Sequence, residues 1–215
     1  MERICEKGTL FIPSVSEIAN KHETFCTVDW AKNMFDTARR ESCGKCVFCR
    51  EGTIQIYTII KDISEGKGEQ DDIELLAELF RILRENAGCE QARTAAGNLL
   101  FALENYPDEW EAHIKRKRCP ALACKKLISV HILPENCQGC GDCTGSCFAG
   151  AIAGGPGMIH VIDPETCNRC GACLAICQYN AIQKAGAIKP KTPETPVPVG
   201  SWEAGGMGRR RRRGV

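Results

Sequence analysis

The residues with the clearest chemistry in this sequence are its cysteines, because twelve of the sixteen occur with the spacing of iron–sulfur ligands. Two runs near the C-terminus follow the pattern C-x2-C-x2-C-x3-C, at Cys137–Cys147 and at Cys167–Cys177. A third group, C-x2-C-x2-C, begins at Cys43, and a single Cys89 follows forty residues after its last cysteine. Thiolates at these spacings hold iron–sulfur clusters, which take up and release single electrons. The sequence therefore predicts an electron-transfer protein.

The two C-terminal runs predict a pair of clusters with exchanged ligands, because the fourth cysteine of each run binds the cluster of the other run. The predicted ligands are Cys137, Cys140, Cys143 and Cys177 for the cluster that we call cluster 2, and Cys167, Cys170, Cys173 and Cys147 for cluster 3. Residues 126–186 resemble the bacterial-type ferredoxin with two [4Fe–4S] clusters, although Phe148 and Gln178 stand where that pattern has proline. Zinc is the alternative metal, but zinc favours two pairs of ligands over triplets with a trailing cysteine.

A disulfide-rich secreted protein is the other class with so many cysteines. The first 13 residues show no apolar stretch followed by a small-residue cleavage site, so we expect no secretory signal. The C-x2-C steps suit a shared metal, and the chain exceeds the usual disulfide-rich module in length. No apolar run approaches the roughly 20 residues of a membrane span. We therefore expect a soluble, cytoplasmic protein with reduced thiols.

Apolar periodicity in the first half of the chain predicts a bundle of helices. These helices are expected from Thr27, over Val47–Ile63, from Asp71 or Asp72, over Ala92–Tyr106, and over Pro107–Ile114. After Ala121 the pattern changes to short strands, expected at Ile128–Ile132 and Met158–Ile162. The stretch 137–152 recurs at 167–182, thirty residues later, which predicts two similar halves.

The predicted fold class is α+β, with a helical bundle that carries one [4Fe–4S] cluster, a two-cluster ferredoxin domain and a disordered basic tail. The predicted segments are an N-terminal extension (1–26), the bundle (27–116), a hinge (117–131), the ferredoxin domain (132–188) and a Pro-, Gly- and Arg-rich tail (189–215). The tail has seven basic residues against two acidic ones, so the rest of the chain is mildly acidic.

The segment Glu41–Thr53, ESCGKCVFCREGT, resembles the signature of the flavin-bearing NADH-oxidising subunit of respiratory complex I and of matching subunits in NAD-linked hydrogenases and formate dehydrogenases. This resemblance implies that Cys43, Cys46, Cys49 and Cys89 hold a third [4Fe–4S] cluster, here called cluster 1. Phe48 stands where the family usually has proline. The order of bundle and ferredoxin, over residues 24–186, looks most like the beta subunit of electron-bifurcating [FeFe] hydrogenases.

Relatives in that family bind FMN and NAD on a large N-terminal domain with a glycine-rich loop. Here about 25 residues precede the bundle, and the sequence has no comparable phosphate-binding loop. We therefore expect the electron path of the family without its FMN or NAD site, and no catalytic site in this chain.

A fourth metal site is expected where His113, Cys119 and Cys124 join the bundle to the ferredoxin part. One imidazole and two thiolates suit tetrahedral zinc, which would stiffen the hinge. His160 or Cys26 could be the fourth ligand, and we favour His160 because it belongs to the ferredoxin half that must be fixed. The alternative is two buried free cysteines and a surface histidine.

The leading functional hypothesis is an electron-transfer subunit of a multisubunit oxidoreductase. Its partners would be a flavoprotein, a catalytic metalloenzyme of hydrogenase, formate dehydrogenase or aldehyde oxidoreductase type, or a ferredoxin. Nucleic-acid binding by Arg209–Arg213 is a second hypothesis, which the acidic body of the chain disfavours. A self-standing reductase with its own flavin is a third. Cys5 has no predicted role.

Overall fold

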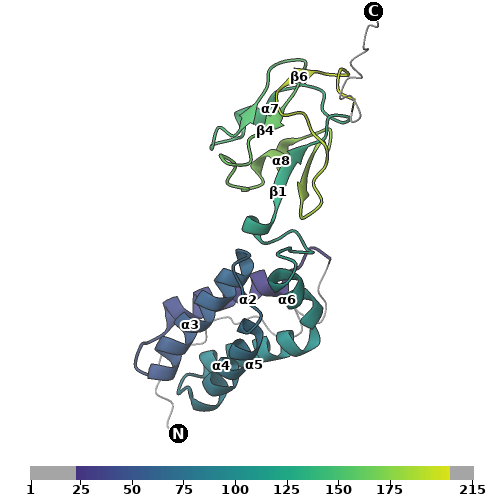
Figure 1. Cartoon of the computed structure of the whole chain (residues 1–215). Coiled ribbons are helices and arrows are strands. Elements are labelled where there is room, and N and C mark those ends of the chain that lie inside the picture. The colour runs from purple at the N-terminus through teal and green to yellow at the C-terminus, as the bar shows by residue number, and fades with distance from the viewer. Residues whose placement is uncertain (1–22, 204–215) are drawn as a thin grey trace, which may run out of the picture. The chain divides into compact units, whose positions relative to one another are not determined.

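The computed structural model describes residues 23–203 and divides the chain into two compact units, residues 1–128 and residues 129–215. Figure 1 shows helices in the first unit and mainly short strands in the second. Cys5, most of the predicted N-terminal extension and the arginine run 209–213 lie outside the described residues. Within residues 23–203, no helix is both long and apolar enough to cross a bilayer.

The first unit is a bundle of helices at the positions that the apolar periodicity predicts. Its elements within residues 23–128 are α2 (Thr27–Glu41), α3 (Val47–Ser64), α4 (Asp72–Asn86), α5 (Glu90–Asn105), α6 (Pro107–Ile114) and the short 3-10 turn η1 (Lys125–Leu127). Apolar side chains from each helix meet in one core, with Val28, Ile60 and Leu99 fully buried. The Phe35 and Phe80 rings join α2 to α4, with their centroids 6.1 Å apart. This core gives the cysteine-bearing segments a rigid support.

Replacing Phe80 with alanine is expected to destabilise the helical unit by about 3–5 kcal/mol, because the ring is fully buried and its removal leaves a cavity beside Phe35. Denaturant unfolding followed by far-UV circular dichroism measures this loss. Leu75→Ala in the same helix is the matched control, because Leu75 is exposed and the expected change is within roughly 0.5 kcal/mol. Equal effects of the two substitutions would contradict the assigned core.

Within residues 129–203, the second unit consists of short antiparallel ladders and two short helices (Figure 1). Its elements are β1 (Ser129–Ile132), α7 (Asp142–Gly145), β2 (Ile152–Ala153), β3 (Met158–Ile159), β4 (Val161–Ile162), α8 (Ala172–Ile176), β5 (Ile182–Ala185) and β6 (Val197–Pro198). The strands pair as β1 with β5, β2 with β4, and β3 with β6. α7 and α8 begin at equivalent positions of the thirty-residue repeat, after Gly141 and Gly171. Both glycines have φ near +90°, which glycine adopts readily.

Residues 189–203 are ordered, so the predicted disorder of the whole tail is wrong for this segment. β6 pairs with β3, bringing Val197 opposite Ile159, and the Val199 N–H donates to the Gly157 carbonyl at 3.0 Å. Val197 and Trp202 pack against the core of the second unit. The prolines of this segment match the composition of a flexible tail, but the apolar residues among them pack on the apolar surface of the second unit.

Candidate iron–sulfur and zinc sites

The cluster 1 cysteines lie in a loop and at the starts of two helices. Cys46 is the N-cap residue of α3, and Cys89 is the N-cap residue of α5. The N–H of Gly88 donates to Cys46 Sγ at 3.4 Å, so the segments around residues 46 and 89 meet although they are far apart in sequence. Cys43 begins the same loop, which turns at Gly44 with φ +72°. Helix N-termini stabilise negative charge, which suits thiolate ligands.

The surroundings of these thiols differ from one cysteine to the next. Burial raises the pKa of Cys49 to about 11. The Ser42 hydroxyl lies 3.3 Å from the Cys49 sulfur and has the opposite, smaller effect of lowering this pKa. The nearby Cys89 thiol raises the pKa of Cys49 further. For Cys46, burial also opposes ionisation, but backbone N–H groups, that of Gly88 first, lower the pKa overall. The thiolate form is therefore favoured at Cys46 and disfavoured at Cys49, where the positive charge of a bound metal would favour it.

The ferredoxin cysteines line two separate cavities in the second unit, four in each. One cavity is lined by Cys137, Cys140, Cys143 and Cys177, and the other by Cys147, Cys167, Cys170 and Cys173. The last cysteine of each run thus faces the cavity of the other run. Burial raises the pKa of Cys143 to about 11 and also raises that of Cys173. The Ala151 N–H donates to Cys147 Sγ at 3.3 Å. These cavities fit metal-bound thiolates with exchanged ligands.

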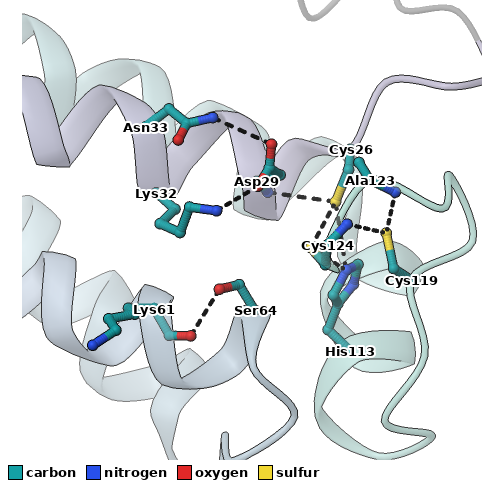
Figure 2. A network of polar contacts seen from close by, with 10 residues as sticks. All are labelled: Cys26, Asp29, Lys32, Asn33, Lys61, Ser64, His113, Cys119, Ala123 and Cys124. Carbon is teal, nitrogen blue, oxygen red and sulfur yellow. Dashed lines mark hydrogen bonds and ion pairs between the residues drawn. The ribbon is translucent and has the colours of Figure 1, made fainter. Parts of the chain in front are cut away.

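A further group of ligand atoms is buried in the helical unit, from Cys26, His113, Cys119 and Cys124. Figure 2 shows these side chains converging from the start of α2, from α6 and from the segment after α6. All four ligand atoms lie within 4.8 Å of one another, and no second group of this kind occurs within residues 23–203. Such close spacing suits a single ion.

The distances in this group match a tetrahedral zinc site. Cys26 Sγ and Cys124 Sγ are 3.8 Å apart, and His113 Nε2 lies 3.4 Å from each of them. Zinc bonds of about 2.3 Å to sulfur and 2.0–2.1 Å to nitrogen place two sulfurs about 3.8 Å apart, and sulfur and nitrogen about 3.5 Å apart. These three ligand atoms therefore have the spacing of tetrahedral zinc ligands, and Cys119 Sγ lies within 4.8 Å of each of them.

Cys26 and not His160 completes this group, which corrects the preference stated from the sequence. Cys26 lies 87 residues before His113, and α2 packs on α6 in the bundle, so a contact distant in sequence supplies the ligand. His160 belongs to the second unit, where its Nδ1 lies 3.9 Å from Cys137 Sγ. His113 itself is fully buried, which excludes the alternative of a surface histidine.

Hydrogen bonds around the group orient its ligands. His113 Nδ1 lies 2.8 Å from the Glu109 carbonyl oxygen, so Nδ1 carries the proton and leaves the Nε2 lone pair free for a metal. The N–H groups of Ala123 and Cys124 donate to Cys119 Sγ at 3.4 and 3.5 Å, and the Asp29 N–H donates to Cys26 Sγ at 3.4 Å (Figure 2).

Contacts among the three thiols shift their pKa values in different directions. Contacts with Cys119 and then Cys124 raise the pKa of Cys26, whereas contacts with Cys124 and Cys26 lower the pKa of Cys119. These contacts therefore favour a thiolate at Cys119 over one at Cys26. A divalent ion would allow all three to ionise together.

Two known families match this chain. Residues 29–113 match the NADH-ubiquinone oxidoreductase-F iron-sulfur binding region, and residues 160–183 match the 4Fe-4S binding domain. These matches confirm the resemblance drawn from the cysteine motifs. The first run, Cys137–Cys147, lies outside both matched ranges, so its assignment depends on the internal repeat and the cavities.

The chain is also similar to curated components of redox complexes. It is 37% identical over 132 residues to the NADP-reducing hydrogenase subunit HndC of Solidesulfovibrio fructosivorans, covering 61% of this chain and 27% of that protein. It is 33% identical over 98 residues to the F subunit of the NADH-quinone oxidoreductase of Streptomyces coelicolor (46% and 22%). It is 30% identical over 125 residues to the beta subunit of the NADP(+)-dependent formate dehydrogenase of Moorella thermoacetica (54% and 18%). The matched part of the chain spans 18–27% of the length of these relatives.

Proposed function

From the two family matches and the two cysteine-lined cavities, we propose that this chain holds three [4Fe–4S] clusters and transfers electrons within a multisubunit oxidoreductase. The observation that carries the proposal is the sorting of eight cysteines into two sets of four, one in each cavity. The relatives are named as subunits of a hydrogenase, an NADH-quinone oxidoreductase and a formate dehydrogenase. We propose a partner of one of these types for this chain.

The residues of the chain would bind the clusters and set their reduction potentials. The substrate chemistry would take place on partner subunits. When bound, the clusters supply one-electron redox chemistry. Cys43, Cys46, Cys49 and Cys89 would hold cluster 1. The backbone N–H groups of Gly88 and Ala151 would donate to cluster thiolates, which stabilises the more negative, reduced form.

Zinc at Cys26, His113, Cys119 and Cys124 would have a structural role. All four ligands are buried, whereas a catalytic zinc site keeps one position for water or substrate. The ligands come from the start of α2, from α6 and from the segment that leads toward residue 128. We propose that the ion fixes this connecting segment to the bundle, which would hold the last part of the helical unit in one conformation.

Anaerobic purification of the full chain tests the proposal. We expect about twelve irons and twelve inorganic sulfides per chain, an EPR spectrum of reduced [4Fe–4S] clusters after dithionite treatment, and uptake of about three electrons in a reductive titration. Fewer than about eight irons in a folded protein, or iron that cannot be cycled between redox states, would contradict it. Zinc is determined in the same samples, so the two metals are assessed separately.

A further inference from the structure

The two ferredoxin cavities are lined by residues that correspond across the thirty-residue repeat. Ile132, Gln138 and Ile182 line the cluster 2 cavity, and their counterparts Ile162, Asn168 and Ile152 line the cluster 3 cavity. At one pair of equivalent buried positions, the two halves carry side chains of different chemistry. His160 lines the cluster 2 cavity, whereas its counterpart Val130 lines the cluster 3 cavity. Both side chains are buried, so the exchange puts an imidazole beside one set of cysteines and an inert aliphatic group beside the other.

The backbone around His160 holds the imidazole in one place. The residue lies between β3 and β4, which pair with different strands, β6 and β2. The backbone of Gly154 packs on the ring so closely that a Cβ at this position would lie 2.5 Å from His160 Cδ2. With 2% of its surface exposed, the side chain has no room to turn toward solvent.

The Nδ1 edge of the ring lies toward the cysteines, and Nδ1 can donate to them in the tautomer that carries its proton there. Nδ1 lies 3.9 Å from Cys137 Sγ, and a metal-bound thiolate accepts hydrogen bonds but cannot donate them. Nε2 is buried and makes no hydrogen bond with any residue in the described part of the chain. A histidine present only for packing would leave a buried nitrogen without a hydrogen-bond partner, a cost that valine avoids in the other half. The arrangement therefore has a local cost that a contact with the cluster would offset.

We propose that His160 donates its Nδ1–H to the Cys137 thiolate and raises the reduction potential of cluster 2. The inference rests on the proposed function, since it needs a cluster at Cys137. A reduced cluster is more negative than an oxidised one, so a hydrogen bond to its thiolate stabilises the reduced form more strongly. Asp142 lines the same cavity, and its charge would act in the opposite direction, but it is exposed and its field is screened by water. The internal repeat thus produces two clusters with different surroundings from nearly identical ligand motifs.

The test is an EPR-monitored redox titration of the full chain with two substitutions at this position. His160→Val installs the side chain of the cluster 3 counterpart, and we expect the reduced-to-oxidised ratio of one cluster to fall about tenfold at a fixed potential, equivalent to about 59 mV for one electron. His160→Asn keeps an N–H donor near the position of Nδ1, and we expect it to retain most of the wild-type potential. The other two clusters should titrate as in the wild type in both variants.

Three outcomes are informative about His160 itself. An unchanged midpoint in His160→Val with full iron content would overturn the inference, and so would equal shifts in the valine and asparagine variants. If His160→Val does not assemble its clusters, the wild-type chain labelled with 15N-histidine provides the answer, because the hydrogen bond should produce a 15N hyperfine coupling in the spectrum of a reduced ferredoxin cluster. Absence of that coupling would also overturn it. Absence of clusters from the wild-type chain would instead count against the proposed function.

Discussion

Replacing Cys124 with serine is expected to remove zinc from the helical unit and to lower its melting temperature by more than about 10 °C. A metal that binds only the folded chain stabilises it by about 4 kcal/mol when its free concentration is 1,000 times Kd. For a unit of about 100 residues, each kcal/mol corresponds to roughly 4–8 °C. Cys124 Sγ contacts both Cys26 Sγ and His113 Nε2, so the substitution removes a ligand that lies next to two of the other three. The serine hydroxyl is a poor replacement, since it remains protonated where the thiolate binds zinc.

Elemental analysis and calorimetry of matched variants check this prediction. Cys26→Ser should lose zinc to the same extent as Cys124→Ser, because both sulfurs belong to the buried group. His160→Val should keep its zinc, which separates Cys26 from the ligand first favoured on sequence grounds. Chelation of the wild type should lower its melting temperature to that of Cys124→Ser and leave the variant unaffected, with iron measured to confirm that the clusters persist. Zinc retained by Cys124→Ser would contradict the assignment.

Local sequence spacing was sufficient to predict an iron–sulfur protein and to name its candidate ligands. Three cysteines within seven residues can reach one cluster whatever the rest of the fold, so the motif at Cys43 and the two ferredoxin runs identify candidate ligands directly. The helices were equally predictable, because the bundle buries one apolar face of each and the 3.6-residue period records that face. Both features depend on residues close together in the chain.

Contacts between distant segments were harder to predict. Cys26 reaches His113 because α2 packs on α6, and the sequence alone does not specify which helix ends meet. Position in the chain favoured His160, whereas burial and packing bring Cys26 to the site. Residues 189–203 show the same difficulty: their composition is that of a flexible tail, but Val197 and Trp202 cover apolar surface of the second unit. Tertiary packing decides both cases.

The two ferredoxin runs predict a second large effect, in which serine variants group by cavity and not by motif. Cys177→Ser should impair the same cluster as Cys137→Ser, although the two residues belong to different runs, because both line one cavity. Cys147→Ser should likewise reproduce Cys167→Ser. Each substitution removes one of four thiolates, so we expect the loss of about four irons or conversion to a three-iron cluster with a distinct EPR signal.

Redox titration identifies which cluster each variant has lost. The midpoint that disappears in Cys177→Ser should be the one that disappears in Cys137→Ser and the one that shifts in His160→Val, because all three residues line the same cavity. The midpoint of the remaining ferredoxin cluster should be the one lost in Cys147→Ser. If Cys177→Ser instead matched Cys167→Ser, each run would hold its own cluster, and the exchanged ligation would be wrong. The arrangement of the cavities favours exchange, because a run confined to its own cluster would need its fourth cysteine to leave the cavity that it lines.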